Sequence, residues 1–320
     1  MQPEPATQGS NMSKWRPQQI PTQQGRLAII TGANSGIGYQ AARYLSRAGA
    51  TVLLACRNRE KGEAARSQIV GSQPTAKVEV RLLDVADLES VRRFANEFLN
   101  EGKALDLLIN NAGVMAIPER RRTPQGFEMQ FGTNHLGHFA LAGLLLPALL
   151  RQPGSRIVTV ASIAHKGGKL NFDDLNAERD YDPRRAYQQS KLANLVFGLE
   201  FDRRLRARSA ETASVIAHPG VAVTNIVSNG MGTGLKGRIV NALLPLIAQS
   251  DIRGSWPLLY AATSPEAHGG GYYGPDGIAE IKGTPVEVKP KPHALDPAAG
   301  KRLWEISEKL TGVRYDALDS

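Results

Sequence analysis

The sequence predicts an α/β protein built on a single doubly wound parallel sheet with helices on both faces. From residue 26 onward, short apolar runs alternate with helical runs, which is typical of parallel strands joined by helices. A glycine-rich stretch, TGANSGIG at 31–38, stands between the first apolar run and the first helical run, and no internal repeat or long linker divides the pattern. Because strand–helix–strand crossovers are right-handed, we expect a ligand crevice at the carboxyl ends of the strands.

The individual elements follow this pattern in order. Strands are expected at 26–31, 51–56, 77–85, 105–110, 155–162 and 212–220, and helices at 39–49, 59–70 and 87–102. In the third strand Val78, Val80 and Leu82 alternate as one half-buried face. Asp87 is the expected N-cap of the helix that follows. The run FALAGLLLPALL at 139–150 is too short to span a bilayer and contains a proline, so we expect a buried helix.

The pattern indicates one domain from residue 24 to residue 313. Residues 1–23, which are rich in Gln and Pro, are expected to form a disordered or extended tail, and residues 314–320 a C-terminal tail. Between 225 and 262 a Gly-rich stretch and apolar helical runs are expected to form a lid and an apolar wall for the substrate.

Composition excludes several classes of protein. With 42% hydrophobic residues the chain can bury a substantial core, and a single cysteine, Cys56, allows no internal disulfide. The net charge is +9, but the basic clusters at 120–122 and 203–208 lack interleaved aromatic residues, so no nucleic acid is expected as a partner. The N-terminal region has no apolar core of the length that a signal peptide or membrane anchor needs. We expect a cytoplasmic protein without stable membrane insertion.

The glycine-rich stretch predicts a phosphate site. Glycine lets the chain turn sharply and lets backbone approach a pyrophosphate, which can then sit at a helix N-terminus. The alternative is a tight strand-to-helix turn with no ligand. The predicted contacts of a dinucleotide here are Gly32, Asn34, Ser35, Gly36, Ile37 and Gly38.

Four motifs in order resemble the short-chain dehydrogenase/reductase family. They are T-G-x-x-x-G-x-G at 31–38, N-N-A-G at 110–113, a strand that ends in Ser162, and Y-x-x-x-K at 187–191. The segments TPQGFEMQFGTNHLGHF and AYQQSKLAN are further similar to a subgroup of retinol dehydrogenases and protochlorophyllide-reductase-like enzymes. The resemblance covers nearly the whole chain beyond the N-terminal tail, and it implies a Rossmann fold and a bound nicotinamide dinucleotide.

The resemblance also assigns dinucleotide contacts beyond the glycine turn. Asp84 is expected to accept a hydrogen bond from the adenine amino group, with the Val85 backbone beside it. Asn111, Ala112 and Gly113 are expected beneath the adenine ribose. Near the nicotinamide the expected contacts are Pro219, Gly220, Val221 and Thr224.

The end of the second strand predicts which dinucleotide binds. A carboxylate there would bond the ribose 2′-hydroxyl and repel a 2′-phosphate, but the sequence has Ala55-Cys56-Arg57. Arg57 can hold a phosphate through charge-assisted hydrogen bonds, with Asn58 nearby. The sequence therefore favours NADP(H), with NAD(H) as the alternative if Arg57 is an ordinary surface residue.

The pair Tyr187 and Lys191 is the expected centre of the chemistry. Four residues are about one helical turn, so the two side chains share one face. The resemblance makes Tyr187 the proton donor or acceptor, and Lys191 the cation that favours its phenolate and bonds the nicotinamide ribose. Ser162 would bond the substrate oxygen, and Asn134 would hold a water of a proton relay. The alternative is a helix with a half-buried Tyr and a Lys that extends to solvent.

Nearby histidines are weaker candidates. His135 and His138 have the spacing of a metal pair, but no carboxylate or cysteine completes a site, so helix-surface or packing roles are favoured and no metal is expected. His165, three residues after Ser162, is described as a loop histidine that could line the pocket.

The sequence thus predicts an NADP-dependent oxidoreductase that transfers hydride between nicotinamide and an apolar aldehyde, ketone or alcohol. The alternatives are a non-catalytic dinucleotide-sensing or scaffolding protein and a sugar-nucleotide epimerase or dehydratase. The family resemblance further implies a homodimer or homotetramer that assembles through the helices containing Asn134 and Tyr187.

Overall fold

The computed structural model describes residues 14–221 and 249–319, and within them eight strands form one sheet. The strands are β1 (Leu27–Thr31), β2 (Thr51–Cys56), β3 (Lys77–Leu82), β4 (Leu107–Asn110), β5 (Arg156–Val160), β6 (Ala213–Ala217), β7 (Tyr272–Pro275) and β8 (Pro285–Glu287). Their order across the sheet is β3-β2-β1-β4-β5-β6-β7-β8, and neighbours are parallel except β8, which is antiparallel to β7. This is the predicted doubly wound fold, with its reversal of strand order between β1 and β4.

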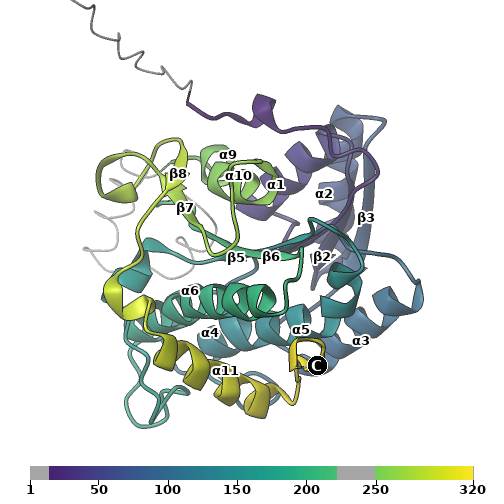
Figure 1. Cartoon of the computed structure of the whole chain (residues 1–320). Helices are drawn as coiled ribbons and strands as arrows, with labels where there is room; N and C mark the ends of the chain where they lie inside the picture. The colour runs from purple at the N-terminus through teal and green to yellow at the C-terminus, as the bar shows by residue number, and fades with distance from the viewer. Residues whose placement is uncertain (1–13, 222–248, 320) are drawn as a thin grey trace, which may run out of the picture.

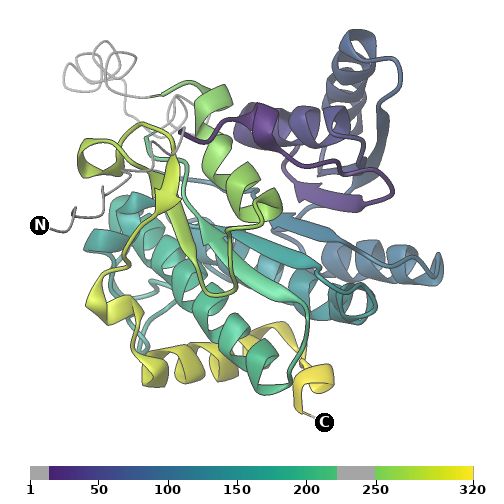
Figure 2. The ribbon, with the colours of Figure 1, turned by 45° about the horizontal axis from the view of Figure 1, so that its top comes forward.

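Two layers of helices cover the sheet (Figure 1). One layer holds α1 (Gly36–Arg47), α2 (Arg59–Ser72), α9 (Asp251–Gly254) and α10 (Trp256–Thr263). The other holds α3 (Leu88–Asn100), α4 (Met129–Phe131), α5 (Gly137–Leu150), α6 (Pro183–Ala207) and α11 (Pro297–Thr311). A second view shows the sheet between these layers (Figure 2). Each layer buries its own apolar cluster against one sheet face, so the strands are apolar on both sides.

Helix α5 is the most deeply buried helix of its layer. Its apolar residues point in all directions, and the expected buried helix at 139–150 lies within it. Among the described residues, the stretch Met129–Leu150 is long and apolar enough to cross a membrane, and 83% of its most apolar window is buried inside the protein.

The sheet differs from the sequence prediction at both of its edges. The six expected strands are present, but β7 and β8 extend the sheet beyond β6 and were not expected. In β3, Val78 is buried as predicted, whereas Leu82 is 46% exposed and Leu83 is buried instead. The alternation fails because β3 ends at Leu82, and the chain turns inward toward α3 from the next residue.

Both expected tails contain residues that pack on the domain. Pro17 and Gln23 are buried, and the Trp15 ring meets the Tyr260 ring edge-on with centroids 5.5 Å apart. At the other end Tyr315 is 1% exposed, and its hydroxyl donates to the Phe139 carbonyl at 2.7 Å. Residues 314–319 of the expected C-terminal tail include the short helix α12 (Asp316–Asp319).

Helix α11 covers α5 and α6, which were the expected oligomer interface. Trp304 of α11 is 2% exposed, and its ring lies 5.2 Å from that of Phe139 in α5 and 5.7 Å from that of Phe201 in α6. The Arg204 guanidinium lies 4.4 Å from the Trp304 ring centroid. A homodimer or homotetramer stays a prediction, but the surface of α5 and α6 beneath Trp304 is already occupied within the chain.

Trp304→Ala should lower the free energy of unfolding by about 3–5 kcal/mol, because it leaves a large cavity among aromatic rings. Urea denaturation followed by circular dichroism measures this loss. Leu295→Ala is the control, since Leu295 is 52% exposed and its truncation should change stability little. A similar loss for both variants would show that α11 does not contribute to the core in this way.

Candidate active site

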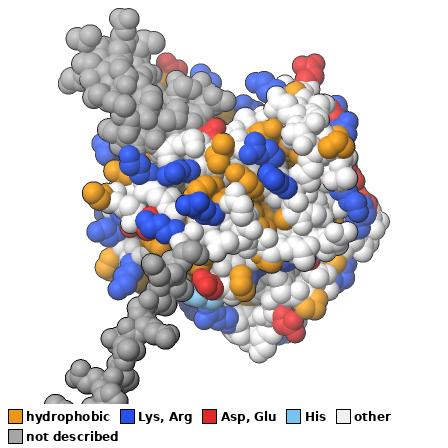
Figure 3. Space-filling view, turned by 90° about the horizontal axis from the view of Figure 1, so that it is seen from above, with side chains coloured by type: hydrophobic (Ala, Val, Ile, Leu, Met, Phe, Trp, Pro, Cys, Tyr) orange, Lys and Arg blue, Asp and Glu red, His pale blue; other side chains and the backbone are white. Residues whose placement is uncertain are grey.

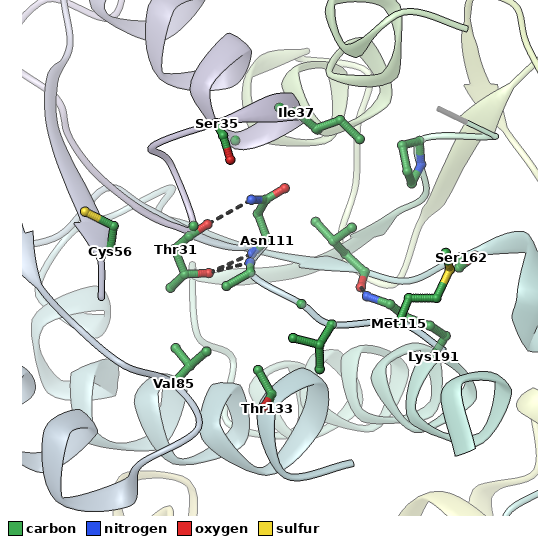
Figure 4. A pocket seen from close by; sticks show the side chains of 18 of the residues that line it. Thr31, Ser35, Ile37, Cys56, Val85, Asn111, Met115, Thr133, Ser162 and Lys191 are labelled. Carbon is green, nitrogen blue, oxygen red and sulfur yellow. Dashed lines mark hydrogen bonds between the residues drawn. The ribbon is translucent and has the colours of Figure 1, made fainter. Parts of the chain in front are cut away.

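A cleft of about 940 Å³ runs along the carboxyl ends of β1, β2, β4, β5 and β6. In Figure 4, Cys56 lies at one end of it and Ser162, Met115 and Lys191 at the other, with Thr31 and Asn111 between them. The cleft is lined by nearly every predicted site residue that the structure describes: Gly32, Asn34, Ser35, Gly36, Ile37, Gly38, Arg57, Asn58, Asp84, Val85, Asn111, Ala112, Gly113, Ser162, Tyr187, Lys191, Pro219, Gly220 and Val221. Asn134 lies behind the cleft wall, and Thr224 and most of the expected lid fall outside the described residues.

The glycine turn presents open N–H groups to this cleft. Gly36 begins α1 with φ +58°, a conformation that favours glycine, and the side chain of its N-cap, Ser35, makes no capping hydrogen bond. A Cβ on Gly38 would collide with the Asn111 amide. The turn therefore fits the pyrophosphate of a dinucleotide, because its backbone donors are uncapped at the positive end of the helix dipole.

Thr31 connects the glycine turn to the loop after β4. Its hydroxyl oxygen accepts from the backbone N–H groups of Asn111 and Ala112, both at 2.9 Å, and its carbonyl accepts from the Asn111 amide at 2.8 Å (Figure 4). The Thr31 hydroxyl also lies 2.9 Å from Nε2 of His138. These bonds hold the two loops on either side of the strand-order reversal in one arrangement.

The expected adenine end is formed by the chain after β3. The Asp84 carboxylate lines the cleft and accepts from the Ala86 N–H at 3.0 Å, which fixes its orientation. The Val85 carbonyl lies so close to α5 that a Cβ on Gly137 would overlap it. Only glycine at position 137 allows α5 to support this loop so closely.

A basic pair lines the cleft after β2. Arg57 and Lys61 both face it, and Asn58 caps α2 by accepting from the Lys61 N–H at 2.8 Å. Lys61 was not predicted, although its place four residues after Arg57 in the first turn of a helix is the signal that could have identified it. The overall charge of +9 has the same sign, and in Figure 3 Lys and Arg side chains gather beside apolar ones in the middle of the face seen from above. Such a surface attracts anions.

Tyr187 and Ser162 meet at the other end of the cleft. Ser162 directly follows Ala161 after β5, and its hydroxyl accepts from the Ala164 N–H at 3.1 Å, so it caps the next turn as well as facing the cleft. Burial raises the pKa of Tyr187, and a hydrogen bond with Ser162 opposes that rise. The phenol is therefore neutral near pH 7 in the protein without ligand.

Lys191 faces the cleft from the turn of α6 after Tyr187. Its ammonium donates to the Val160 carbonyl at 3.1 Å and lies 5.9 Å from the centroid of the Tyr187 ring. Burial lowers the pKa of Lys191 to about 8. In the protein without ligand, burial has the largest effect on the pKa of Tyr187, and the effect of the Lys191 ammonium on the phenolate stays a prediction.

Asn134 lies in a π-helical turn, Gly132–Leu136, between α4 and α5. Its side chain accepts from the Val114 N–H at 2.8 Å and donates to the Val114 carbonyl and to the Ser190 hydroxyl, both at 2.9 Å. Single π-turns are frequent at functional sites. A Cβ on Gly113 would lie 3.1 Å from the Asn134 side-chain oxygen and 3.6 Å from the Lys191 nitrogen, so Asn134 borders the lysine from behind.

The two histidines of the metal-like pair are buried and have separate partners. His138 Nδ1 lies 3.0 Å from the Asn134 carbonyl, and His135 Nε2 lies 2.9 Å from the Ser307 hydroxyl on α11. Burial lowers the pKa of His135 to about 3 and of His138 to about 4, so both are neutral. Within 14–221 and 249–319 no cluster of three or more metal-ligand side chains occurs.

Hydrogen bonds with Gln249 and Ile281 fix the segment Pro219–Val221, and neither of these residues was predicted from the sequence. Gln249 donates to the Pro219 carbonyl at 2.5 Å, and its own N–H donates to the Val221 carbonyl at 2.8 Å. The Val221 N–H donates to the Ile281 carbonyl at 2.9 Å. Gln249 could not be found from sequence because it lies 30 residues from Pro219 and belongs to no motif.

A model of the short chain dehydrogenase family matches residues 26–172. Human retinol dehydrogenase 13 is 41% identical over 297 residues, which cover 90% of this chain and 85% of that protein. Mouse polyprenol dehydrogenase is 40% identical over 305 residues, which cover 93% of this chain and 88% of that protein.

Two solved structures share the fold of this chain. A structure from Mycobacterium Paratuberculosis, described as an uncharacterized protein, is 41% identical and superposes with a TM-score of 0.78, covering 95% of this chain and 99% of that one. The Pseudomonas aeruginosa RhlG/NADP active-site complex, 19% identical with a TM-score of 0.61, covers 78% of this chain and 94% of that one and shares the fold. The chain belongs to the short chain dehydrogenase family and is an oxidoreductase of the retinol dehydrogenase type, acting on alcohol or carbonyl groups.

Proposed function

We propose that this protein is an NADP-dependent oxidoreductase that transfers hydride between nicotinamide and an apolar alcohol or carbonyl substrate, with Tyr187 as general acid and base. The observation that carries the proposal is the single cleft that joins the glycine turn to Ser162, Tyr187 and Lys191. A bound nicotinamide dinucleotide would supply or accept the hydride.

The protein's own groups would handle the proton and the orientation of the substrate. In carbonyl reduction the Ser162 hydroxyl donates a hydrogen bond to the substrate oxygen, and the Tyr187 hydroxyl donates its proton to that oxygen. In alcohol oxidation the proton would move to a Tyr187 phenolate, which the Lys191 ammonium and the positive charge of an oxidised nicotinamide would favour. The raised pKa of Tyr187 keeps its proton available as an acid, and a substrate or ribose hydroxyl near Lys191 can replace the Val160 carbonyl as partner of the ammonium.

Tyr187→Phe should lower kcat by about a hundredfold to ten thousandfold, since it removes the proton donor but keeps the ring. Turnover is measured as NADPH oxidation with a panel of aldehydes and ketones. NADPH binding, followed by fluorescence, should stay within about twofold of the unaltered protein because the phenolic oxygen is not needed to bind the phosphates. Retained turnover would refute the role of Tyr187. Binding without turnover in the unaltered protein would favour a dinucleotide-sensing function instead.

The preference for NADP(H) over NAD(H) is supported by the two cations after β2. Arg57 and Lys61 line the cleft, no carboxylate takes the place that would bond a 2′-hydroxyl, and Asn58 orients the first turn of α2 between them. An arginine and a lysine at this point can share the 2′-phosphate oxygens.

Arg57→Ala should weaken NADPH binding by about tenfold to a hundredfold and leave NADH binding nearly unchanged, because it removes a charge-assisted contact with the 2′-phosphate. Isothermal titration with both dinucleotides measures the difference. The matched control is Arg47→Ala, an exposed arginine at the far end of α1 that does not line the cleft. Equal losses for the two dinucleotides would contradict the assignment.

The substrate class is inferred from a smaller pocket beside Tyr187. Its volume is about 470 Å³, and it is lined by Met115, Ala116, Ile163, Ala164, Gly167, Arg184, Tyr187 and Gln188. Most of this lining is apolar, and the carboxylates of the described residues are absent from it. The relatives named for retinol and polyprenol act, by those names, on apolar alcohols, which supports a substrate of the same kind.

Medium-chain or aromatic carbonyls should have a kcat/KM at least about tenfold higher than sugars or keto acids of similar size, because the pocket offers apolar contacts to the first group. Steady-state kinetics with matched pairs of substrates provide the comparison. A higher kcat/KM for the polar or anionic partner of each pair would overturn the pocket assignment and leave hydride transfer intact.

The cytoplasmic location and the absence of stable membrane insertion remain proposals that cell fractionation can test.

A further inference from the structure

Glu280, a carboxylate outside the predicted set, lies between two segments that carry site residues. One carboxylate oxygen accepts from the Lys166 ammonium at 2.7 Å. The other lies 3.0 Å from Nε2 of His218, although the angles fall outside those of a regular hydrogen bond. Contacts of this kind are often poorly aligned before a ligand binds. Glu280 therefore contacts both the turn after Ser162 and the segment that begins at His218.

The backbone around Glu280 is unusual. Ala279 has φ 53° and Glu280 has φ 59°, so two consecutive residues with side chains adopt the left-handed conformation. This conformation is unfavourable for residues other than glycine, because their Cβ comes too close to the following carbonyl oxygen. Strain of this kind persists where the surrounding structure requires it, and it is frequent at functional sites. Here it directs the Glu280 side chain toward His218 and Lys166.

His218 transmits the contact to the expected nicotinamide segment. The ring is fully buried, and its Nδ1 accepts from the Gly220 N–H at 3.2 Å. Because Nδ1 accepts, the ring proton is assigned to Nε2, the nitrogen that faces Glu280. Gly220 has φ +67°, and a Cβ there would overlap the Ile281 carbonyl, the same carbonyl that accepts from Val221. The Glu280–Ile281 stretch thus holds this segment by side chain and by backbone.

Lys166 transmits the contact to the catalytic serine. It belongs to the 3₁₀ turn Ile163–Gly167, which Ser162 caps. In the same turn His165 Nδ1 donates to the Ser162 carbonyl at 2.7 Å. The Lys166–Glu280 bond therefore fixes the turn that positions the Ser162 backbone.

The charges around Glu280 agree with this arrangement. The contacts with His218 and Lys166 lower the pKa of Glu280 to about 2, so the carboxylate is ionised. Burial lowers the pKa of His218 despite Glu280, and burial lowers the pKa of His165 to about 4. A further titratable group among the described residues here is Tyr272, whose buried phenol lies 3.4 Å from His165 Nδ1. At neutral pH both histidines are therefore neutral beside the ionised carboxylate.

We infer that Glu280 is a positioning residue that fixes Pro219–Val221 relative to Ser162, through His218 and Lys166, and thereby sets the nicotinamide end of the site. The inference rests on the proposed dinucleotide-dependent function. A glutamine at this position could not serve both donors, because its NH₂ group would face either Lys166 or the His218 N–H.

The test compares a whole dinucleotide with its adenine half. Glu280→Gln in the full chain should weaken NADP⁺ binding by about three- to tenfold, the loss for one weakened hydrogen bond, and leave binding of adenosine 2′,5′-bisphosphate unchanged. Isothermal titration measures both ligands, and NAD⁺ with ADP replaces them if the protein prefers NAD(H). Lys166→Met, whose ammonium is partly exposed, should shift the same ratio in the same direction.

The matched control is Glu287→Gln. Glu287 is the last residue of β8, and its exposed carboxylate lies 3.2 Å from His268. It should change neither ligand's affinity. Equal losses for the dinucleotide and its adenine half in Glu280→Gln, or no loss for either, would overturn the positioning role alone. If the unaltered protein bound no dinucleotide, the proposed function would fail and this inference with it.

Discussion

The site depends on the hydrogen bonds of the Thr31 hydroxyl, which joins the end of β1 to the loop after β4. Strand order reverses between β1 and β4, so the loops that leave these strands diverge there and open the crevice. Thr31 accepts from the backbone of Asn111 and Ala112 and closes the floor of that crevice. Gly38 must then lack a side chain because α1 passes directly over the Asn111 amide. The glycine turn and the loop after β4 are therefore one interlocked unit.

A second constraint links this unit to the chemistry. His138 bonds the Thr31 hydroxyl with one ring nitrogen and the Asn134 carbonyl with the other. Because the Thr31 hydroxyl already accepts two N–H bonds, it donates its own hydrogen to His138 Nε2, which must then be unprotonated. Complete burial keeps the ring neutral, as this bond requires. The π-turn that carries Asn134 brings its amide against Val114 and close to Gly113, which is also close to the Lys191 ammonium. His138 therefore joins the Thr31 hydroxyl to this π-turn through buried contacts.

The two ends of the cleft differ in the charge that they stabilise. At the glycine turn no side chain caps the backbone N–H groups of α1, so the negative charge of a ligand would be stabilised there. Around Tyr187 and Lys191, desolvation favours the neutral forms of both groups. A proton can move between a phenol and a substrate oxygen at such a site with little cost from solvent reorganisation. The edge strands β7 and β8 support this end, because they place Glu280 and Ile281 against the chain after β6.

The sequence by itself determined the fold class, the first six strands along the chain, and many of the residues that line the cleft. These features depend on local periodicity and on short motifs, and each motif lies at the end of a strand whose position follows from parallel topology. The tertiary structure decided the rest. Gln249 and Glu280 act through contacts with segments far away in the chain, and the burial of Trp304 and Tyr315 depends on packing between α11 and the helices before it. The pKa of Tyr187 likewise depends on how many atoms surround it after folding, which the spacing of a tyrosine and a lysine along one helix does not reveal.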